Sequence, residues 1–140
     1  MYLVNTRPNI CYAVGILNQF MSEPRQVHWV VGKHMLRCLQ GTVGHGFRYA
    51  SCDVMRLEGY SDSDWAGSSV DRRGTSECCF SLGSTTISWC NRKQTSVVLS
   101  TVEAEYIAMN LVAREAVWLR KLLVGLFGQM LEPTVIHYDN

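Results

Sequence analysis

The chain has 140 residues, of which 47% are hydrophobic and 18% are charged, and it contains only three prolines. This composition is typical of a globular domain and argues against a disordered chain. Thirteen basic and twelve acidic residues give a formal charge of +1, so the chain as a whole has no strong field that attracts nucleic acid or a membrane. Contact with nucleic acid would therefore require a local basic patch.

The longest apolar run covers residues 10–17, which is well short of the ~20 residues that a membrane-spanning helix needs. Asn18 and Gln19 interrupt the run, and no small-residue cleavage site follows it. We therefore expect neither membrane contact nor a signal peptide, and we expect the protein to act in the cytoplasm or nucleus.

The six cysteines form no C-x-x-C pair, and they have no regular spacing with the four histidines that would indicate a zinc site. Cys78 and Cys79 are adjacent, so on a strand their side chains would face opposite sides. We expect buried, reduced thiols, as in an intracellular protein.

Residues 1–47 have the apolar spacing of helices. The spacing predicts one helix within residues 7–21, where Pro8 suits the first turn, and a second over residues 27–41 that is capped by Gly41. A Glu-Pro-Arg break separates the two. This part of the chain is therefore expected to form a helical hairpin.

From Phe47 onward the apolar period changes to two, which is typical of strands. Strands are predicted over residues 57–65, 75–83 and 85–91, the last two joined by a hairpin near Gly83.

A basic loop at residues 91–94 is expected to lead into a long amphipathic helix over residues 100–128, which begins with Ser100 and Glu103 as a capping box. A last strand is predicted over residues 134–140. A helix that returns to a strand beside the first one builds a parallel strand pair. The expected fold class is α/β with a mixed sheet.

Acidic side chains occur in three elements that this fold would bring together. Asp62 and Asp64 lie in the first predicted strand, Glu105 near the start of the long helix, and Asp139 near the end of the last strand. Carboxylate oxygens suit Mg²⁺ or Mn²⁺, and two such ions ~4 Å apart can activate a water and stabilise the leaving oxygen of a phosphodiester. The alternative is that these acids are ordinary turn, helix-start and strand-end charges, because a helix N-terminus favours an acid by itself.

Longer motifs bear on this choice. The stretches "GYSDSDWAG", "DRRGTSE", "STVEAEYIAM", "REAVWLRKLL" and "HYDN" closely resemble the ribonuclease H region of Copia-type retrotransposon polyproteins. The stretches "TRPNICYAVGILNQFM", "VHWVVGKHMLRCLQGT" and "GHGFRY" resemble the end of the reverse transcriptase that precedes this region. The resemblance covers almost the whole chain in the family's order. It implies a helical reverse-transcriptase tail at residues 1–47 and a truncated ribonuclease H-like domain at residues 48–140.

The resemblance implies a fold in which carboxylates bind two Mg²⁺ or Mn²⁺ ions and cut the RNA strand of an RNA–DNA hybrid. The catalytic and metal-binding residues that it implies are Asp62, Glu105 and Asp139. Asp64 is either an accessory ligand or a residue that supports the site from outside.

Basic residues near the predicted strands are candidates for contact with the phosphates of the hybrid, and solvated loop charges are the alternative. These residues are Arg72, Arg73, Arg92 and Lys93.

The sequence also departs from the family pattern. The family's fourth metal-site carboxylate has no counterpart among these 140 residues, the catalytic aspartates of the polymerase are absent, and "ECCF" stands where the family usually has a glycine and an aromatic residue. We therefore predict no polymerase activity, and weak or no cleavage by this chain alone.

Copia-like chains of this kind also resemble sequences described as secreted RxLR effectors of oomycetes. Under this alternative the chain would be a non-enzymatic protein, secreted and delivered into host plant cells, that binds a host protein and suppresses defence or cell death. The supporting feature is a degenerate motif without a following acidic cluster, and composition alone explains its occurrence: Arg37, Cys38, Leu39 and Gln40. A third alternative is the product of a decayed element with no biochemical role.

Overall fold

The structure is a computed structural model that describes residues 3–50, 55–64, 73–128 and 131–138, without the side chain of Asp64. The chain divides into two compact units, Met1–Phe47 and Arg48–Asn140. We refer to them as the helical unit and the sheet unit and describe each by itself. The described residues form a mixed α/β structure with a four-stranded sheet, which confirms the expected fold class and is consistent with a ribonuclease H-like fold.

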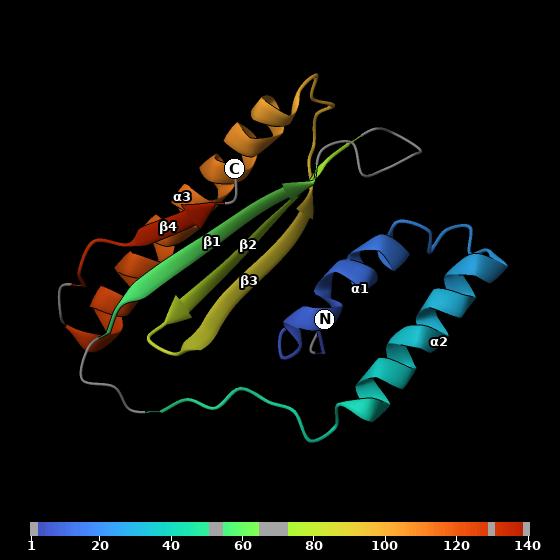
Figure 1. Cartoon of the computed structure of the whole chain (residues 1–140), viewed down its shortest axis with the longest axis horizontal. Helices are drawn as coiled ribbons and strands as arrows, with labels where there is room; N and C mark the ends of the chain where they lie inside the picture. Colours follow the sequence, from blue (N-terminus) through green and yellow to red (C-terminus); the bar gives the residue numbers. More distant parts are fainter. Residues whose placement is uncertain (1–2, 51–54, 65–72, 129–130, 139–140) are drawn as a thin grey trace. The chain divides into compact units, whose positions relative to one another are not determined.

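The helical unit consists of a short 3₁₀-helix, η1 (Pro8–Ile10), followed by α1 (Cys11–Asn18) and α2 (Gln26–Gly41) (Figure 1). Pro8 occupies the first position of η1, where a backbone N–H is not needed. α1 and α2 contact one another, which confirms the predicted helical hairpin. Ile10 is the one buried residue that the structure describes in this unit.

The first predicted helix proved shorter than its apolar pattern suggested. The N–H groups of Gln19 and Phe20 bond to carbonyls three residues earlier, so the chain tightens and leaves the α-helix there. The Phe20 ring then stacks on His28 of α2, with 4.2 Å between ring centroids.

The sheet unit contains a four-stranded sheet in the order β3-β2-β1-β4. Its strands are β1 (Leu57–Asp64), β2 (Thr75–Leu82), β3 (Thr85–Lys93) and β4 (Val135–Tyr138). β2 is antiparallel to both of its neighbours, whereas β4 is parallel to β1, as Figure 1 shows. The hairpin between β2 and β3 turns at Gly83, which has φ +60°, and this confirms the predicted hairpin. The pairing of β4 with β1 confirms the predicted parallel pair.

One helix, α3 (Thr101–Phe127), packs on the sheet through a stripe of buried residues at helical spacing. The stripe consists of Ala104, Ala108, Val112, Ala116, Leu119 and Leu123. Its small alanines allow the helix to lie close to the sheet, where Leu57 and Phe80 are fully buried. Gly59 is required in this core, because a Cβ atom there would lie 2.7 Å from Cε1 of the Phe80 ring.

Both ends of α3 agree with the sequence prediction. The N–H of Glu103 donates to Ser100 Oγ (3.2 Å), so Ser100 is the N-cap as predicted; the Glu103 carboxylate accepts from the N–H of Leu99 (2.9 Å), one residue before the N-cap that a capping box would use. Gly128 ends the helix in the left-handed conformation at φ +66°. No helix in the described part of the chain is long and apolar enough to cross a membrane.

The predicted basic loop after residue 91 proved to be part of a strand. β3 continues to Lys93, because Arg92 and Lys93 pair with Ser76 and Thr75 of β2. The N–H of Gln94 then bonds to the carbonyl of Gly74 (2.8 Å). Cross-strand backbone pairing therefore outweighs the polar character of these residues.

The expectation of reduced thiols was wrong for two cysteines. Cys78 and Cys90 are register partners on β2 and β3, their Cα atoms are 5.1 Å apart, and they form a disulfide. This distance lies within the range that a disulfide can bridge. Among the described cysteines, Cys11, Cys38 and Cys79 form no disulfide, whereas Cys52 lies outside the described residues.

Candidate active site

A small cleft of about 40 Å³ lies where the carboxyl ends of β1 and β4 meet the first turns of α3. Figure 1 shows that these two strand ends and the start of the helix lie at the same end of the sheet unit. β1 contributes Ser61, Asp62 and Ser63 to the cleft, and β4 contributes Tyr138. On the α3 side it is lined by Glu105, Ala108 and Met109.

Two of the predicted carboxylates therefore line one cleft. Along β1, Ser61 is buried and Asp62 is exposed at the rim, where the N–H of Ser63 donates to Asp62 Oδ1 (2.7 Å). Glu105 is half-buried near the N-terminus of α3, where the helix dipole favours a negative charge. The packing of α3 on β1 brings these distant positions of the chain together.

The remaining predicted site residues are only partly placed. Asp139, which follows Tyr138 in the sequence, and Arg72 lie outside the described residues. Asp64 ends β1 as the register partner of Thr75, and its side chain also lies outside them.

The chemistry of the cleft is that of hard oxygen donors. Asp62 and Glu105 supply carboxylate oxygens, and Mg²⁺ is commonly bound by one or two carboxylates together with waters and substrate phosphates. Within residues 3–50, 55–64, 73–128 and 131–138, no three histidines, cysteines or acids lie close enough to hold a metal ion. The described donors thus fit a cation that prefers oxygen ligands and takes its remaining ligands from water and a substrate. They do not form a closed cage of protein ligands.

The chain is similar in sequence to one effector protein and to polyproteins of transposons. It is 46% identical over 120 residues to secreted RxLR effector protein 161 of Plasmopara viticola, an alignment that covers 85% of this chain and 84% of that protein. It is 41% identical over 139 residues to the retrovirus-related Pol polyprotein from transposon RE2 of Arabidopsis thaliana, and 39% identical over 138 residues to that from transposon TNT 1-94 of Nicotiana tabacum. Each of these two alignments covers 99% of this chain.

The chain is homologous over 99% of its length to retrovirus-related Pol polyproteins of transposons. It spans about 10% of the length of the Pol polyproteins that it matches, so it corresponds to a segment of a retroelement polyprotein. No protein-family model matches the sequence, and no solved structure matches the fold.

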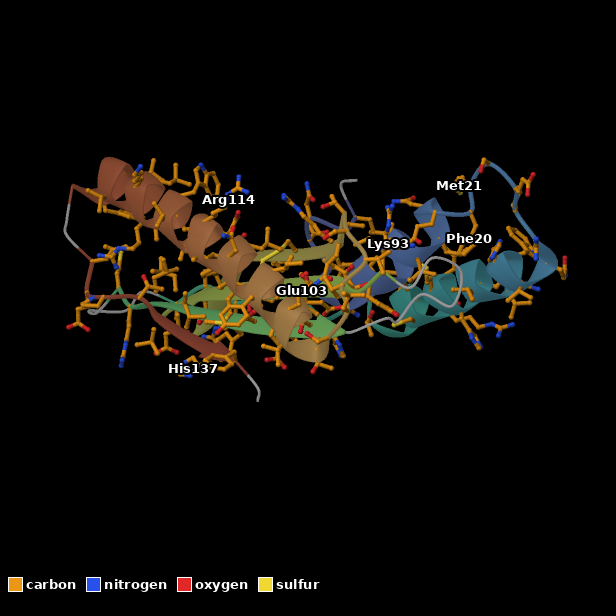
Figure 2. All side chains as sticks on the ribbon, turned by 90° about the horizontal axis from the view of Figure 1, so that it is seen from above. Phe20, Met21, Lys93, Glu103, Arg114 and His137 are labelled. Carbon is orange, nitrogen blue, oxygen red and sulfur yellow. A yellow bond between two sulfur atoms is a disulfide. The ribbon has the colours of Figure 1, made fainter. Side chains whose placement is uncertain are left out.

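Basic residues lie near the candidate site of this Pol segment. Arg92 pairs with Ser76, which pairs in turn with Ser63 at the cleft, so Arg92 lies two strands away, at roughly 10 Å. Figure 2 labels Lys93 at the end of β3 and Glu103 at the start of α3. Arg73 is exposed just before β2. The strand pairing thus carries Arg92 and Lys93 to the same end of the sheet as Asp62.

Gln94 holds the start of α3 against β2, a role that the sequence analysis did not predict. The side chain of Gln94 is buried, and its Nε2 donates to Ser76 Oγ (3.0 Å) and to the carbonyl of Ala104 (3.2 Å). It therefore ties the start of α3, one residue before Glu105, to β2. The sequence does not indicate this role, because Gln94 lies in a polar stretch that was predicted to be a loop.

A third carboxylate faces Asp62 across the strands. Glu77 is the register partner of Asp62 and accepts a hydrogen bond from Asn91 Nδ2 (2.5 Å). Like charges directly opposite one another repel, so this amide contact offsets part of the cost. The sequence did give a signal here, since Glu77 is the first residue of the unusual "ECCF" stretch.

The neighbouring cross-strand pair on β1 and β4 is aromatic. Tyr60 and His137 stack with 5.0 Å between ring centroids, and Tyr60 Oη donates to Glu58 Oε2 (3.3 Å). Burial and the nearby Glu58 carboxylate raise the pKa of the Tyr60 hydroxyl above its ordinary value. This contact joins β1 to β4 one residue before Tyr138.

Proposed function

We propose that the sheet unit carries a ribonuclease H-type site that cuts the RNA strand of an RNA–DNA hybrid. The observation that carries the proposal is that Asp62 and Glu105 line one cleft in a chain homologous to transposon Pol polyproteins. The order of β1, α3 and β4 around this cleft supports the addition of Asp139, which directly follows the last described residue of β4.

The residues present fit Mg²⁺ or Mn²⁺, since the described lining of the cleft offers carboxylate oxygens and neither a thiolate nor an imidazole, and its one sulfur is the thioether of Met109, a soft donor that these hard ions do not favour. Asp62, Glu105 and Asp139 would hold the ions, with Asp64 as an accessory. Bound ions of this kind supply an activated water and stabilise the leaving oxygen.

The chain's own residues have preparatory roles in this proposal. The N–H of Ser63 orients the Asp62 carboxylate, and Gln94 fixes the start of α3, which carries Glu105. Arg92 and Lys93 supply positive charge for the phosphates of the hybrid, because guanidinium and ammonium groups neutralise nucleic-acid phosphates. Their place on a strand keeps this charge at the same end of the sheet as the cleft.

Cleavage of a labelled RNA–DNA hybrid with Mg²⁺ or Mn²⁺ tests the proposal, together with Mn²⁺ binding as a second readout. We expect slow cleavage, because the family's fourth carboxylate has no counterpart among these residues. Asp62→Asn and Glu105→Gln should abolish it and weaken Mn²⁺ binding on the order of tenfold or more. The matched control is Glu103→Gln, which removes a charge from the same helix and keeps the capping acceptor. Cleavage that survives Asp62→Asn, or an equal loss with Glu103→Gln, would contradict the proposal.

A second candidate function rests on the relative that is named a secreted RxLR effector protein. Under this proposal the chain would be exported and would bind a host plant protein without acting as an enzyme. The Cys78–Cys90 disulfide favours it, since disulfides persist in oxidising compartments and are rare in the cytosol. The degenerate motif Arg37–Gln40 offers little support, because it lies inside α2.

A secretion-trap assay distinguishes the two functions. Export directed by residues 1–30, followed by suppression of host cell death by the full chain, would support the effector function. Retention inside the cell would count against it and would leave the nuclease proposal untouched.

A further inference from the structure

A second cleft, of about 300 Å³, lies entirely within the helical unit. It is formed by the segment that enters η1 and the segment that leaves α2, and its lining includes Arg7, Asn9, Thr42, His45 and Phe47. The volume is at the lower end of the range for small-molecule sites. None of these residues belongs to the candidate active site of the sheet unit.

The lining of the cleft includes an arginine whose hydrogen-bond partner is an uncharged residue. Arg7 is half-buried, and its Nη1 donates to Thr42 Oγ1 (3.3 Å). Thr42 Oγ1 donates in turn to the carbonyl of Cys38 (2.8 Å), so the threonine is held in place by the end of α2. This contact fixes one side of the guanidinium without neutralising its charge.

Compensating acids are almost absent from this part of the sequence. Residues 1–47 contain four basic residues and a single acid, Glu23, which gives a formal charge of +3. Glu23 lies in the turn between α1 and α2, whereas Arg7 and Thr42 lie at the opposite ends of these two helices (Figure 1). An anionic ligand would therefore meet an unopposed positive charge within this unit.

The other groups that line the cleft indicate which kind of anion it can bind. A guanidinium presents a planar fork of donors that matches the oxygens of a phosphate. The Asn9 amide and the His45 imidazole can donate further hydrogen bonds, and the Phe47 ring supplies an aromatic wall on which a base can stack. The set of donors, charge and aromatic surface corresponds to a phosphate with an attached base.

We propose that this cleft binds the phosphate group of a nucleotide, either free or within a nucleic-acid strand. The proposal does not depend on the nuclease proposal, since it uses no residue of the sheet unit. Arg7 binds the phosphate oxygens, Thr42 holds Arg7 in place, and Phe47 contacts the base.

Titration calorimetry on the full chain tests this with three probes at one fixed ionic strength: inorganic phosphate, uridine monophosphate and a single-stranded RNA decamer. Arg7→Gln should weaken binding of every probe that binds the wild type by about 10- to 100-fold, because it removes a charge-assisted hydrogen bond. Lys33→Gln is the matched control, since it removes the same charge from an exposed position of α2, and it should change affinity by less than about twofold. Phe47→Leu should weaken the binding of uridine monophosphate and leave the affinity for inorganic phosphate unchanged.

The pattern of binding identifies the source of the phosphate. Binding of phosphate and uridine monophosphate that depends on Arg7 assigns the cleft to free nucleotides, and Arg7-dependent binding of the decamer alone assigns it to a strand. Equal losses with Arg7→Gln and Lys33→Gln would show attraction by overall charge and overturn the proposal, as would no binding of any probe. If Arg7→Gln loses helical circular dichroism, Arg7→Lys replaces it, because it keeps the charge and loses the fork; undiminished binding by that folded variant would also overturn the proposal.

Discussion

The helical unit and the sheet unit both contain amphipathic helices, but only one of them buries an apolar cluster within itself. In the sheet unit, α3 packs its alanine and leucine stripe on Leu57 and Phe80. In the helical unit, α1 and α2 have no buried residue, and large apolar side chains such as Trp29 and Leu36 are more than half exposed. Apolar periodicity therefore predicts that a helix forms, but not that a core exists to receive it.

The two units also differ in charge. The helical unit has a formal charge of +3, which leaves nine basic and eleven acidic residues and a charge of −2 on the sheet unit. The near-neutral total of +1 conceals this division. An argument from net charge is consequently weaker when it is made for the whole chain than when it is made for each unit.

The largest test of this comparison is the removal of one phenylalanine from each unit. Phe80→Ala should lower the free energy of unfolding by about 3–5 kcal/mol, because the Phe80 ring is fully buried under α3. Phe20→Ala should cost less than about 1.5 kcal/mol, since Phe20 is only half-buried and its described ring contact is the stack on His28. Urea unfolding followed by circular dichroism measures both. Equal losses would mean that the helical unit shares a cooperative core, contrary to the comparison.

The next largest effect concerns the disulfide. Reduction, or Cys78→Ala, should lower the free energy of unfolding by about 3 kcal/mol, as expected for a cross-link between residues separated by 12 positions. Cys79→Ala is the matched control on the same strand, where the thiol is free. Peptide mass mapping under non-reducing conditions should recover Cys78 linked to Cys90. Recovery of two free thiols in air-oxidised protein would argue against the cross-link and would restore the original expectation.

The cysteines show where sequence reasoning stopped. The helix cap at Ser100, the turn at Gly83 and the end at Gly128 could be predicted, because each depends on residues a few positions apart. The pairing of Cys78 with Cys90 depends on the register between β2 and β3, which the alternating pattern does not determine.

The candidate site divides in the same way. The sequence predicted Asp62 and Glu105 as site residues, and the structure places both at one cleft. It did not identify Gln94, whose contacts with Ser76 and Ala104 arise only when β2, β3 and α3 are packed together. The strand that extends to Lys93 was missed for the same reason, since its polar residues pair through the backbone.

The smallest test is one substitution made at two glycines, one in each unit. Gly59→Ala should destabilise the sheet unit by about 1–3 kcal/mol, because the new Cβ would lie 2.7 Å from Cε1 of the Phe80 ring, which is itself fully buried. Gly32→Ala should stabilise α2 by about 0.5–1 kcal/mol, because alanine has the higher helix propensity and a Cβ at Gly32 meets no atom within 4 Å. The two variants therefore differ in sign although the chemical change is identical. Thermal unfolding of both should show it, and a destabilised Gly32→Ala would reveal tight packing on α2 that the exposed side chains of the helical unit do not indicate.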